Sequence, residues 1–134
     1  MGIFYCEKDG TFTLQTKNTT YQMKADRQGT LLHTYYGQKT DRTDKSYWIC
    51  CRDRGFSGNP YGMDRAYSLD TLPQEYSCFG TGDYRISALK VKNTDGSAAS
   101  ALRYVSHKIT EGKYSLPGLP AAYGTKEEAQ TLIV

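Results

Sequence analysis

The fold class is decided by the stretch TFTLQTKNTTYQMKADRQGTLLHTYY, residues 11–36. Apolar and polar residues alternate along 12–15 and again along 20–25, on either side of a turn at 17–18. Because successive side chains of a strand point to opposite faces of a sheet, this alternation predicts two half-buried antiparallel strands. Residues 30–36 are apolar at odd and even positions alike, which is typical of a strand covered on both faces. The chain is therefore predicted to begin with a β-meander.

Strand patterns also occur further along the chain. Residues 47–51 form a short apolar run, and the segments 89–92 and 103–110, separated by a turn, predict a second hairpin. The stretch 37–82 otherwise lacks periodicity, and a long irregular stretch in a compact domain is usually functional. Residues 131–134 resemble a strand that has only begun, so we expect the chain to be part of a longer protein. No long amphipathic helical pattern occurs, and the sequence predicts an all-β antiparallel sandwich.

Length and charge exclude several classes of protein. A chain of 134 residues suffices for one domain but not for a catalytic α/β barrel, which takes about 250 residues. The 17 Lys and Arg are balanced by 14 Asp and Glu, and a net charge of +3 without basic runs predicts no nucleic-acid partner. No apolar run is long enough for a signal peptide or a membrane span, so we expect a cytoplasmic protein without a membrane partner.

The residues that usually hold metals or cofactors lack the necessary spacing. The sequence contains four cysteines without a C-x-x-C motif, Cys6, Cys50, Cys51 and Cys78. Cysteines in such a pattern are predicted to be buried and reduced. His33 and His107 lie on strand patterns with no Cys or Asp at ligand spacing, which favours packed histidines over a metal site. The GTG run at 80–82 lacks the third glycine and the following helix of a phosphate-binding loop, so no cofactor is expected.

Carboxylates gather in the irregular central stretch, at Asp53, Asp64, Asp70, Glu75 and Asp83. A glycosidase needs two carboxyl groups facing each other across a sugar at about 5 to 9.5 Å, and spacing along the chain does not establish such a pair. Acidic residues in Gly-rich loops more often form turns or ion pairs. No catalytic residue is therefore assigned.

The segment RDRGFSGNPY, residues 52–61, is the candidate binding loop. It combines arginines, a phenylalanine between glycines and an asparagine. Guanidinium and amide groups bind sugar hydroxyls, and an exposed aromatic ring stacks on a pyranose face. The alternative is a loop whose arginines only pair with neighbouring aspartates.

Several longer motifs, in register over essentially the whole chain, resemble the N-terminal domain of glycoside hydrolase family 36, the melibiase-type α-galactosidases. These are LLHTYYG at 31–37, DTLPQEY at 70–76, GTGDYR at 80–85, LRYVSH at 102–107, LPGLPA at 116–121 and AQTL at 129–132.

The resemblance implies a β-supersandwich, of which this chain is the first part, placed before a (β/α)₈ barrel. The nucleophilic and acid/base aspartates of such an enzyme lie on barrel strands beyond residue 134, so this chain alone should not be catalytic. The parent would cleave terminal α-galactosides, such as melibiose and raffinose, with retention.

Family members often form tetramers in which a loop of this domain reaches a neighbour's active site. The matching residues are Phe56, Asn59 and Arg65, which are expected to touch sugar or an adjoining subunit of a homo-oligomer. Two alternatives are a stand-alone carbohydrate-binding module and a truncated gene product without a ligand. A barrel with paired aspartates downstream would distinguish the first reading from both.

Overall fold

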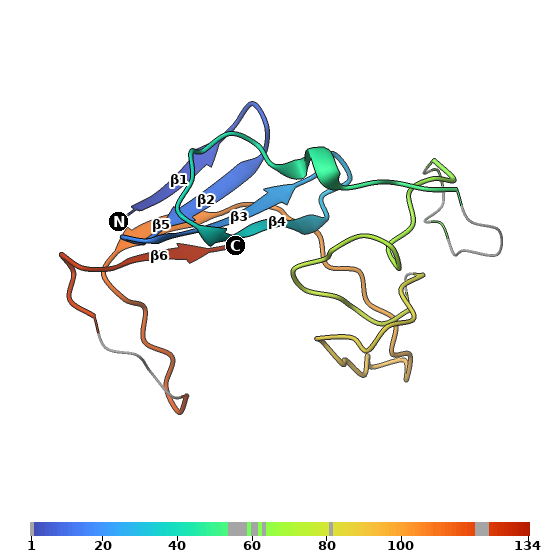
Figure 1. Ribbon diagram of the computed structural model, residues 1–134. Helices are drawn as coiled ribbons and strands as arrows, with labels where there is room; N and C mark the ends of the chain where they lie inside the picture. Colours follow the sequence, from blue (N-terminus) through green and yellow to red (C-terminus); the bar gives the residue numbers. More distant parts are fainter. Residues whose placement is uncertain (1, 54–58, 60–61, 63, 81, 120–123) are drawn as a thin grey trace.

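The computed structural model describes residues 2–53, 59, 62, 64–80, 82–119 and 124–134. Four strands form an antiparallel sheet in chain order (Figure 1), which confirms the predicted meander and adds to it a first strand that the pattern did not predict. They are β1 (Gly2–Cys6), β2 (Thr11–Gln15), β3 (Thr19–Ala25) and β4 (Leu31–Gln38). The all-β antiparallel class is therefore confirmed.

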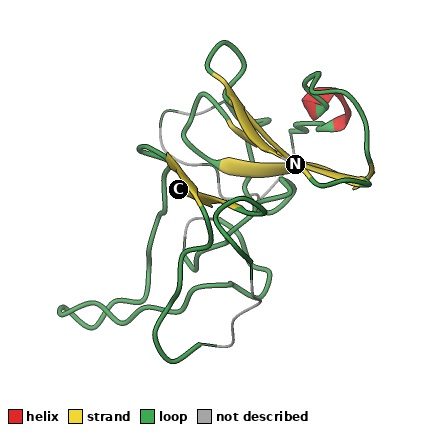
Figure 2. Ribbon diagram, turned by 90° about the vertical axis from the view of Figure 1, so that its left-hand side faces the viewer, coloured by secondary structure: helices red, strands yellow, loops and turns green. Residues whose placement is uncertain are grey.

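A second, two-stranded antiparallel sheet consists of β5 (Lys108–Glu111) and β6 (Gln130–Ile133). It lies against one face of the four-stranded sheet (Figure 1). The Ile3 main-chain N–H donates a hydrogen bond of 2.8 Å to the side-chain oxygen of Gln130, which joins β6 to β1. The described helix is a single 3₁₀ turn, η1 (Ser46–Trp48), and much of the remaining chain is loop (Figure 2). Among the described residues, no helix has the length and apolar content that a membrane crossing requires.

The edge strand β4 differs from the prediction of a strand covered on both faces. Only Leu32 and Thr34 of its side chains are buried, so one face is packed and the other is partly open. The outer edge of β4 is instead protected by the chain near Gln74, which forms a bridge with Leu32. The apolar run at 30–36 thus reflects the contact with this later segment of the same chain as well as packing within the sheet.

Two further strand predictions are wrong. Residues 47–51 contain the end of η1 and then loop, because Ile49 packs against the buried cluster as a single side chain rather than within a sheet. The predicted hairpin of 89–92 with 103–110 does not form. Residue Leu89 makes only an isolated bridge to Cys78, and β5 takes β6 as its partner instead. Along 89–92 the side chains alternate between partly buried and exposed, which is the pattern of a strand, but the segment has no strand partner beyond that bridge.

The apolar core has two parts. One is a cluster of buried residues packed with Ile49, namely Leu32, Tyr67, Leu69 and Leu72. The other surrounds Phe12, which is fully buried and packs against Tyr5 and His107, with ring centroids 4.6 and 4.9 Å away. His107 is therefore a packed histidine, as expected, and it brings the chain before β5 onto the sheet.

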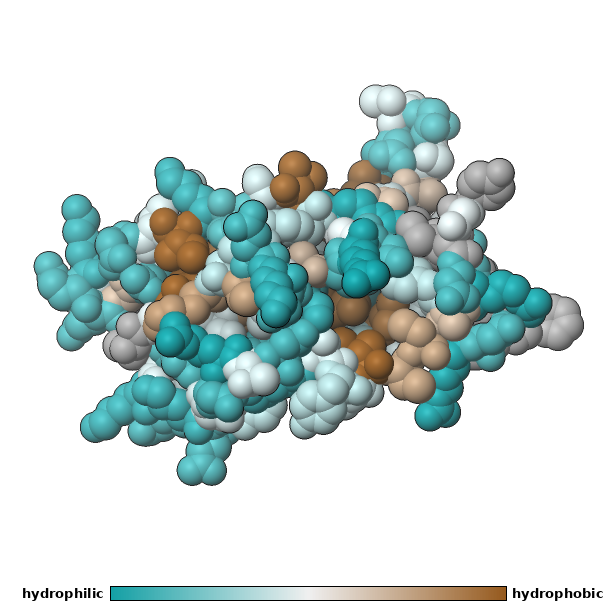
Figure 3. Space-filling model, turned by 90° about the horizontal axis from the view of Figure 1, so that it is seen from above, coloured by the Kyte–Doolittle hydropathy of each residue, from teal (hydrophilic) through white to brown (hydrophobic). Residues whose placement is uncertain are grey.

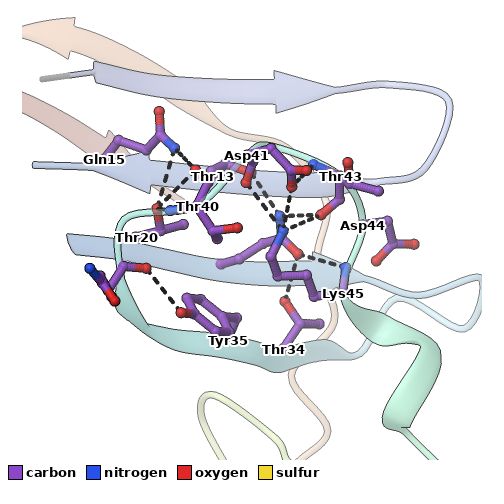
Figure 4. Close-up of polar contacts among 12 residues, drawn as sticks. Thr13, Gln15, Thr20, Thr34, Tyr35, Thr40, Asp41, Thr43, Asp44 and Lys45 are labelled. Atoms are coloured by element: carbon purple, nitrogen blue, oxygen red, sulfur yellow. Dashed lines mark hydrogen bonds and ion pairs between the residues drawn. The ribbon is translucent and has the colours of Figure 1, made fainter. Parts of the chain in front are cut away.

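The face of the sheet opposite Phe12 carries a network of polar side chains, and the segment 39–48 covers it (Figure 4). Gln22, which is fully buried, donates from its amide to the Thr13 hydroxyl and the Thr43 carbonyl, at 3.0 and 3.1 Å. Its side-chain oxygen accepts from the Thr34 hydroxyl and the Lys45 main-chain N–H, at 3.2 and 2.9 Å. Since a buried polar group is stable only when its hydrogen bonds are made, Gln22 fixes the position of this covering segment.

The prediction that the four cysteines are buried is wrong for three of them. All four are free thiols, but only Cys78 is buried, whereas Cys6, Cys50 and Cys51 are exposed. The last two follow η1 in a loop, and the apolar run that predicted their burial is not a strand.

Candidate functional site

The loop that carries the candidate residues Asn59 and Arg65 spans residues 52–65 and is followed by the buried residue Tyr67. Within it, the Arg65 guanidinium lies 3.4 Å from the Asp53 carboxylate, with side-chain exposures of 78% and 54%. An ion pair this exposed contributes little stability, because water screens it. The Arg65 side chain is therefore accessible to a ligand or another subunit, even though one aspartate lies beside it.

Asn59 holds the returning half of the loop. Its side-chain Nδ2 donates to the main-chain carbonyl oxygens of Asp64, Arg65 and Tyr67, at 3.2, 2.6 and 2.9 Å. One amide group therefore fixes the backbone on both sides of Arg65. The structure brings two of the three predicted site residues together, while Phe56 lies outside the described residues.

Tyr67 anchors this loop to the sheet. Its hydroxyl donates to the Asp26 carboxylate at 2.7 Å and lies 2.6 Å from the Thr30 hydroxyl. Arg103 reaches the same place and donates to the Thr30 hydroxyl at 3.0 Å and to the Gln28 carbonyl at 3.1 Å. Burial raises the pKa of Tyr67, and the hydrogen bond to Asp26 acts in the same direction, so the phenol stays protonated. Sequence reasoning did not identify this anchor, because no local pattern links residues this far apart.

A cleft of about 660 Å³ lies beside the loop. Its lining includes Cys51, Asp64 and Tyr67, Lys24 at the end of β3, and residues of the β1–β2 and β3–β4 turns such as Asp26. The lining carries charges of both signs, which suits polar ligands better than apolar ones. The face shown in Figure 3 is also mostly hydrophilic, with apolar side chains in small separate groups.

The five central carboxylates all have hydrogen-bond or ion-pair partners within the chain. Asp83, almost fully buried, accepts from Arg85 Nε and Nη2, both at 2.8 Å, and from the Gln74 amide at 2.7 Å. Arg85 also donates to two main-chain carbonyls of the preceding loop. These contacts lower the pKa of Asp83, with the Arg85 hydrogen bond as the largest cause.

Glu75 lies between two side chains of the sheet. It accepts from the Tyr21 hydroxyl and lies 3.0 Å from His33 Nδ1. Asp70 accepts a hydrogen bond from the Ser68 hydroxyl. Within the part of the chain that the structure describes, no group of three His, Cys, Asp or Glu side chains is placed to hold a metal ion.

The architecture defines an all-β domain of antiparallel sheets whose loop with Asn59 and Arg65 is anchored, through Tyr67, to the turn between β3 and β4. The family model of the glycosyl hydrolase family 36 N-terminal domain matches residues 29–134. The chain belongs to this family, and the resemblance noted from its motifs is confirmed.

The relatives are α-galactosidases. The chain is 54% identical over 134 residues to the bifunctional alpha-galactosidase/sucrose kinase AgaSK of Mediterraneibacter gnavus, covering 98% of this chain and 14% of that protein. It is 43% identical to alpha-galactosidase Mel36A of Lactobacillus acidophilus, with 98% of this chain and 18% of that protein covered. The chain thus spans less than a fifth of the length of these relatives.

Solved structures give the same result. The galactosidase domain of AgaSK superimposes with a TM-score of 0.93 at 53% identity, over 98% of this chain and 18% of that one. The α-galactosidase AgaB of Geobacillus stearothermophilus superimposes with a TM-score of 0.88 at 41% identity, over 98% of this chain and 18% of that one. Variants of a third similar protein, AgaA from the same organism, were solved in complex with raffinose and with stachyose.

Proposed function

We propose that this chain serves as the N-terminal domain of an α-galactosidase that hydrolyses terminal α-galactosides of the raffinose and melibiose type with retention. The carrying observation is family membership together with the 98% coverage of the chain by α-galactosidase relatives. In this proposal the chemistry belongs to a barrel elsewhere in the protein. The domain contributes a scaffold, an oligomerisation surface and a lid over a neighbouring active site.

The loop of 52–65 is the part of the domain that would form the lid. Asn59 hydrogen-bonds to the backbone around Arg65, and the Arg65 guanidinium is exposed. The loop therefore presents a positively charged group on a hydrogen-bonded backbone. Such a group binds sugar hydroxyls or carboxylates of another subunit. Phe56 is proposed to act beside it, by stacking on sugar or inserting into the partner.

The proposal is tested by comparing the isolated chain with the complete α-galactosidase that carries it. The isolated chain should not hydrolyse a chromogenic α-galactoside, while the complete enzyme should. Turnover by the isolated chain that is lost in Asp70→Asn or Asp83→Asn would contradict the assignment. Titration of the isolated chain with raffinose in a calorimeter addresses the alternative. Saturable binding there would favour a stand-alone carbohydrate-binding module.

A further inference from the structure

Two adjacent cysteines, Cys50 and Cys51, follow η1 and precede the candidate loop. Both are exposed and both are free thiols. The proposed galactosidase role uses neither of them. Two accessible thiols on neighbouring residues form a potential bidentate ligand, which a single cysteine does not.

The surroundings of the pair are asymmetric. The Arg52 side chain lies next to Cys50, and this neighbour raises the pKa of the Arg52 guanidinium. Cys51 faces the cleft that Asp64 and Tyr67 also line. Reactive cysteines typically occupy partly exposed positions next to a cation, and Cys50 meets both conditions. The two thiols are consecutive in the chain and both exposed, so one small reagent can reach both of them.

Geometry favours a bridging atom over a direct sulfur–sulfur bond. Consecutive Cα atoms lie about 3.8 Å apart across a trans peptide, whereas disulfides usually join Cα atoms about 4.4 to 6.8 Å apart. A disulfide between neighbours is consequently strained and easily reduced. An atom that bonds two sulfurs at about 2.3 Å each accommodates sulfurs up to roughly 4 Å apart.

The number of protein ligands beside Cys50 and Cys51 limits which atoms these two thiols can bind. No third His, Cys, Asp or Glu joins these two thiols in a metal-binding group among the described residues. A structural zinc site takes four protein ligands, so zinc is a poor match. Soft sulfur ligands instead bind thiophilic atoms. The atom that suits Cys50 and Cys51 is one that needs only two sulfur ligands from the protein.

We propose that Cys50 and Cys51 form a dithiol binding site for monosubstituted trivalent arsenicals and similar thiophilic electrophiles. In the reaction of an organic arsine oxide, the two S–H bonds and the As=O bond break and two As–S bonds form. Both protons leave with the oxygen as one molecule of water. Arsenic stays trivalent throughout, so no oxidant or reductant is required.

The test titrates the full chain, freshly reduced and freed of reductant, with phenylarsine oxide. We expect one equivalent to bind per chain, with loss of two titratable thiols, and 2,3-dimercaptopropanol to reverse the binding far better than 2-mercaptoethanol. Cys50→Ser and Cys51→Ser should each weaken binding by about 10²- to 10⁴-fold, the advantage of an intramolecular second bond. Cys6→Ser is the matched control, because it removes another exposed thiol and should leave the affinity unchanged.

Equal weakening in Cys6→Ser, or undiminished binding in Cys50→Ser, would overturn the proposal. So would a Cys50–Cys51 disulfide in the untreated protein, found by mass spectrometry of unreduced peptides. Thermal melts check that each variant is folded. If a serine variant does not fold, Cys50→Ala and Cys51→Ala provide the same comparison.

Discussion

The side-chain Nδ2 of Asn59 lies 2.9 Å from the main-chain carbonyl oxygen of Tyr67 and ties an exposed loop to a buried residue. The same nitrogen reaches the carbonyls of Asp64 and Arg65. A side chain predicted to touch a ligand therefore also shapes the loop that would present Arg65. Its two roles are separable by substitution.

Asn59→Asp replaces the donor with a carboxylate that faces three carbonyl oxygens, whereas Asn59→Ala only removes the donor. The alanine variant should lower the free energy of unfolding by about 1 kcal/mol, and the aspartate variant by more, because it adds repulsion. Urea unfolding at pH 7 measures both. An aspartate variant as stable as wild type would show that these hydrogen bonds do not hold the loop.

Tyr67→Phe should destabilise the domain by about 1 to 3 kcal/mol, because the Asp26 carboxylate and the Thr30 hydroxyl lose a partner at a buried position. The matched control is Tyr47→Phe, since Tyr47 is 87% exposed, and that change should stay within about 0.5 kcal/mol of wild type. Thermal melts compare the two. If both variants lose the same stability, the hydrogen bonds of the Tyr67 hydroxyl do not stabilise the domain.

Gln22→Leu tests the polar face of the sheet. The leucine fills a similar volume but leaves four hydrogen-bonding groups of its neighbours without Gln22, two of them on the covering segment (Figure 4). We expect a loss of about 2 to 4 kcal/mol and faster amide exchange along 39–48. Gln38→Leu, at an exposed position of β4, is the control. Unchanged exchange along 39–48 would contradict the role given to Gln22.

The Asp83–Arg85 pair predicts an acid-dependent loss of stability. The folded-state pKa of Asp83 lies below its ordinary value, so its contribution is complete above an unfolded pKa of about 3.9 and is lost as pH falls through the folded pKa. The stability difference between wild type and Asp83→Asn should therefore be constant from pH 7 to 5 and shrink below pH 4. A difference that grows on acidification would reverse the sign of the argument.

The N-terminal meander could be predicted from the alternation along 12–15 and 20–25, but its strands are not half-buried as expected, because Phe12 is buried on one face of the sheet and Gln22 on the other. Neither 89–92 nor 47–51 becomes a strand, because Leu89 makes only an isolated bridge to Cys78 and Ile49 packs against the buried cluster without a strand partner. The period of a sequence pattern indicates which side chains are buried, not which backbone groups are hydrogen-bonded. Whether such a segment becomes a strand depends on partners that are distant in the sequence.

The site was predictable only in part. Residue types indicated the segment with Asn59, the family resemblance added Arg65, and the structure brings the two together. The anchor at Tyr67 depends on Asp26 and Thr30, which are distant in sequence and follow no motif. The exposure of Cys50 and Cys51 was missed because their apolar neighbours suggested a strand.

The central claim is that the loop of 52–65 serves an active site carried elsewhere in an α-galactosidase. The most direct test measures kcat/KM for raffinose in the complete enzyme, with Phe56→Ala and Arg65→Ala set against Lys17→Ala in an exposed turn. We predict that each loop variant loses about 1 to 3 kcal/mol of transition-state stabilisation or subunit association, with an unchanged melting temperature. The Lys17 variant should match wild type. A lower melting temperature with unaltered kinetics and assembly would contradict the account, because it would make these residues part of the domain's own packing.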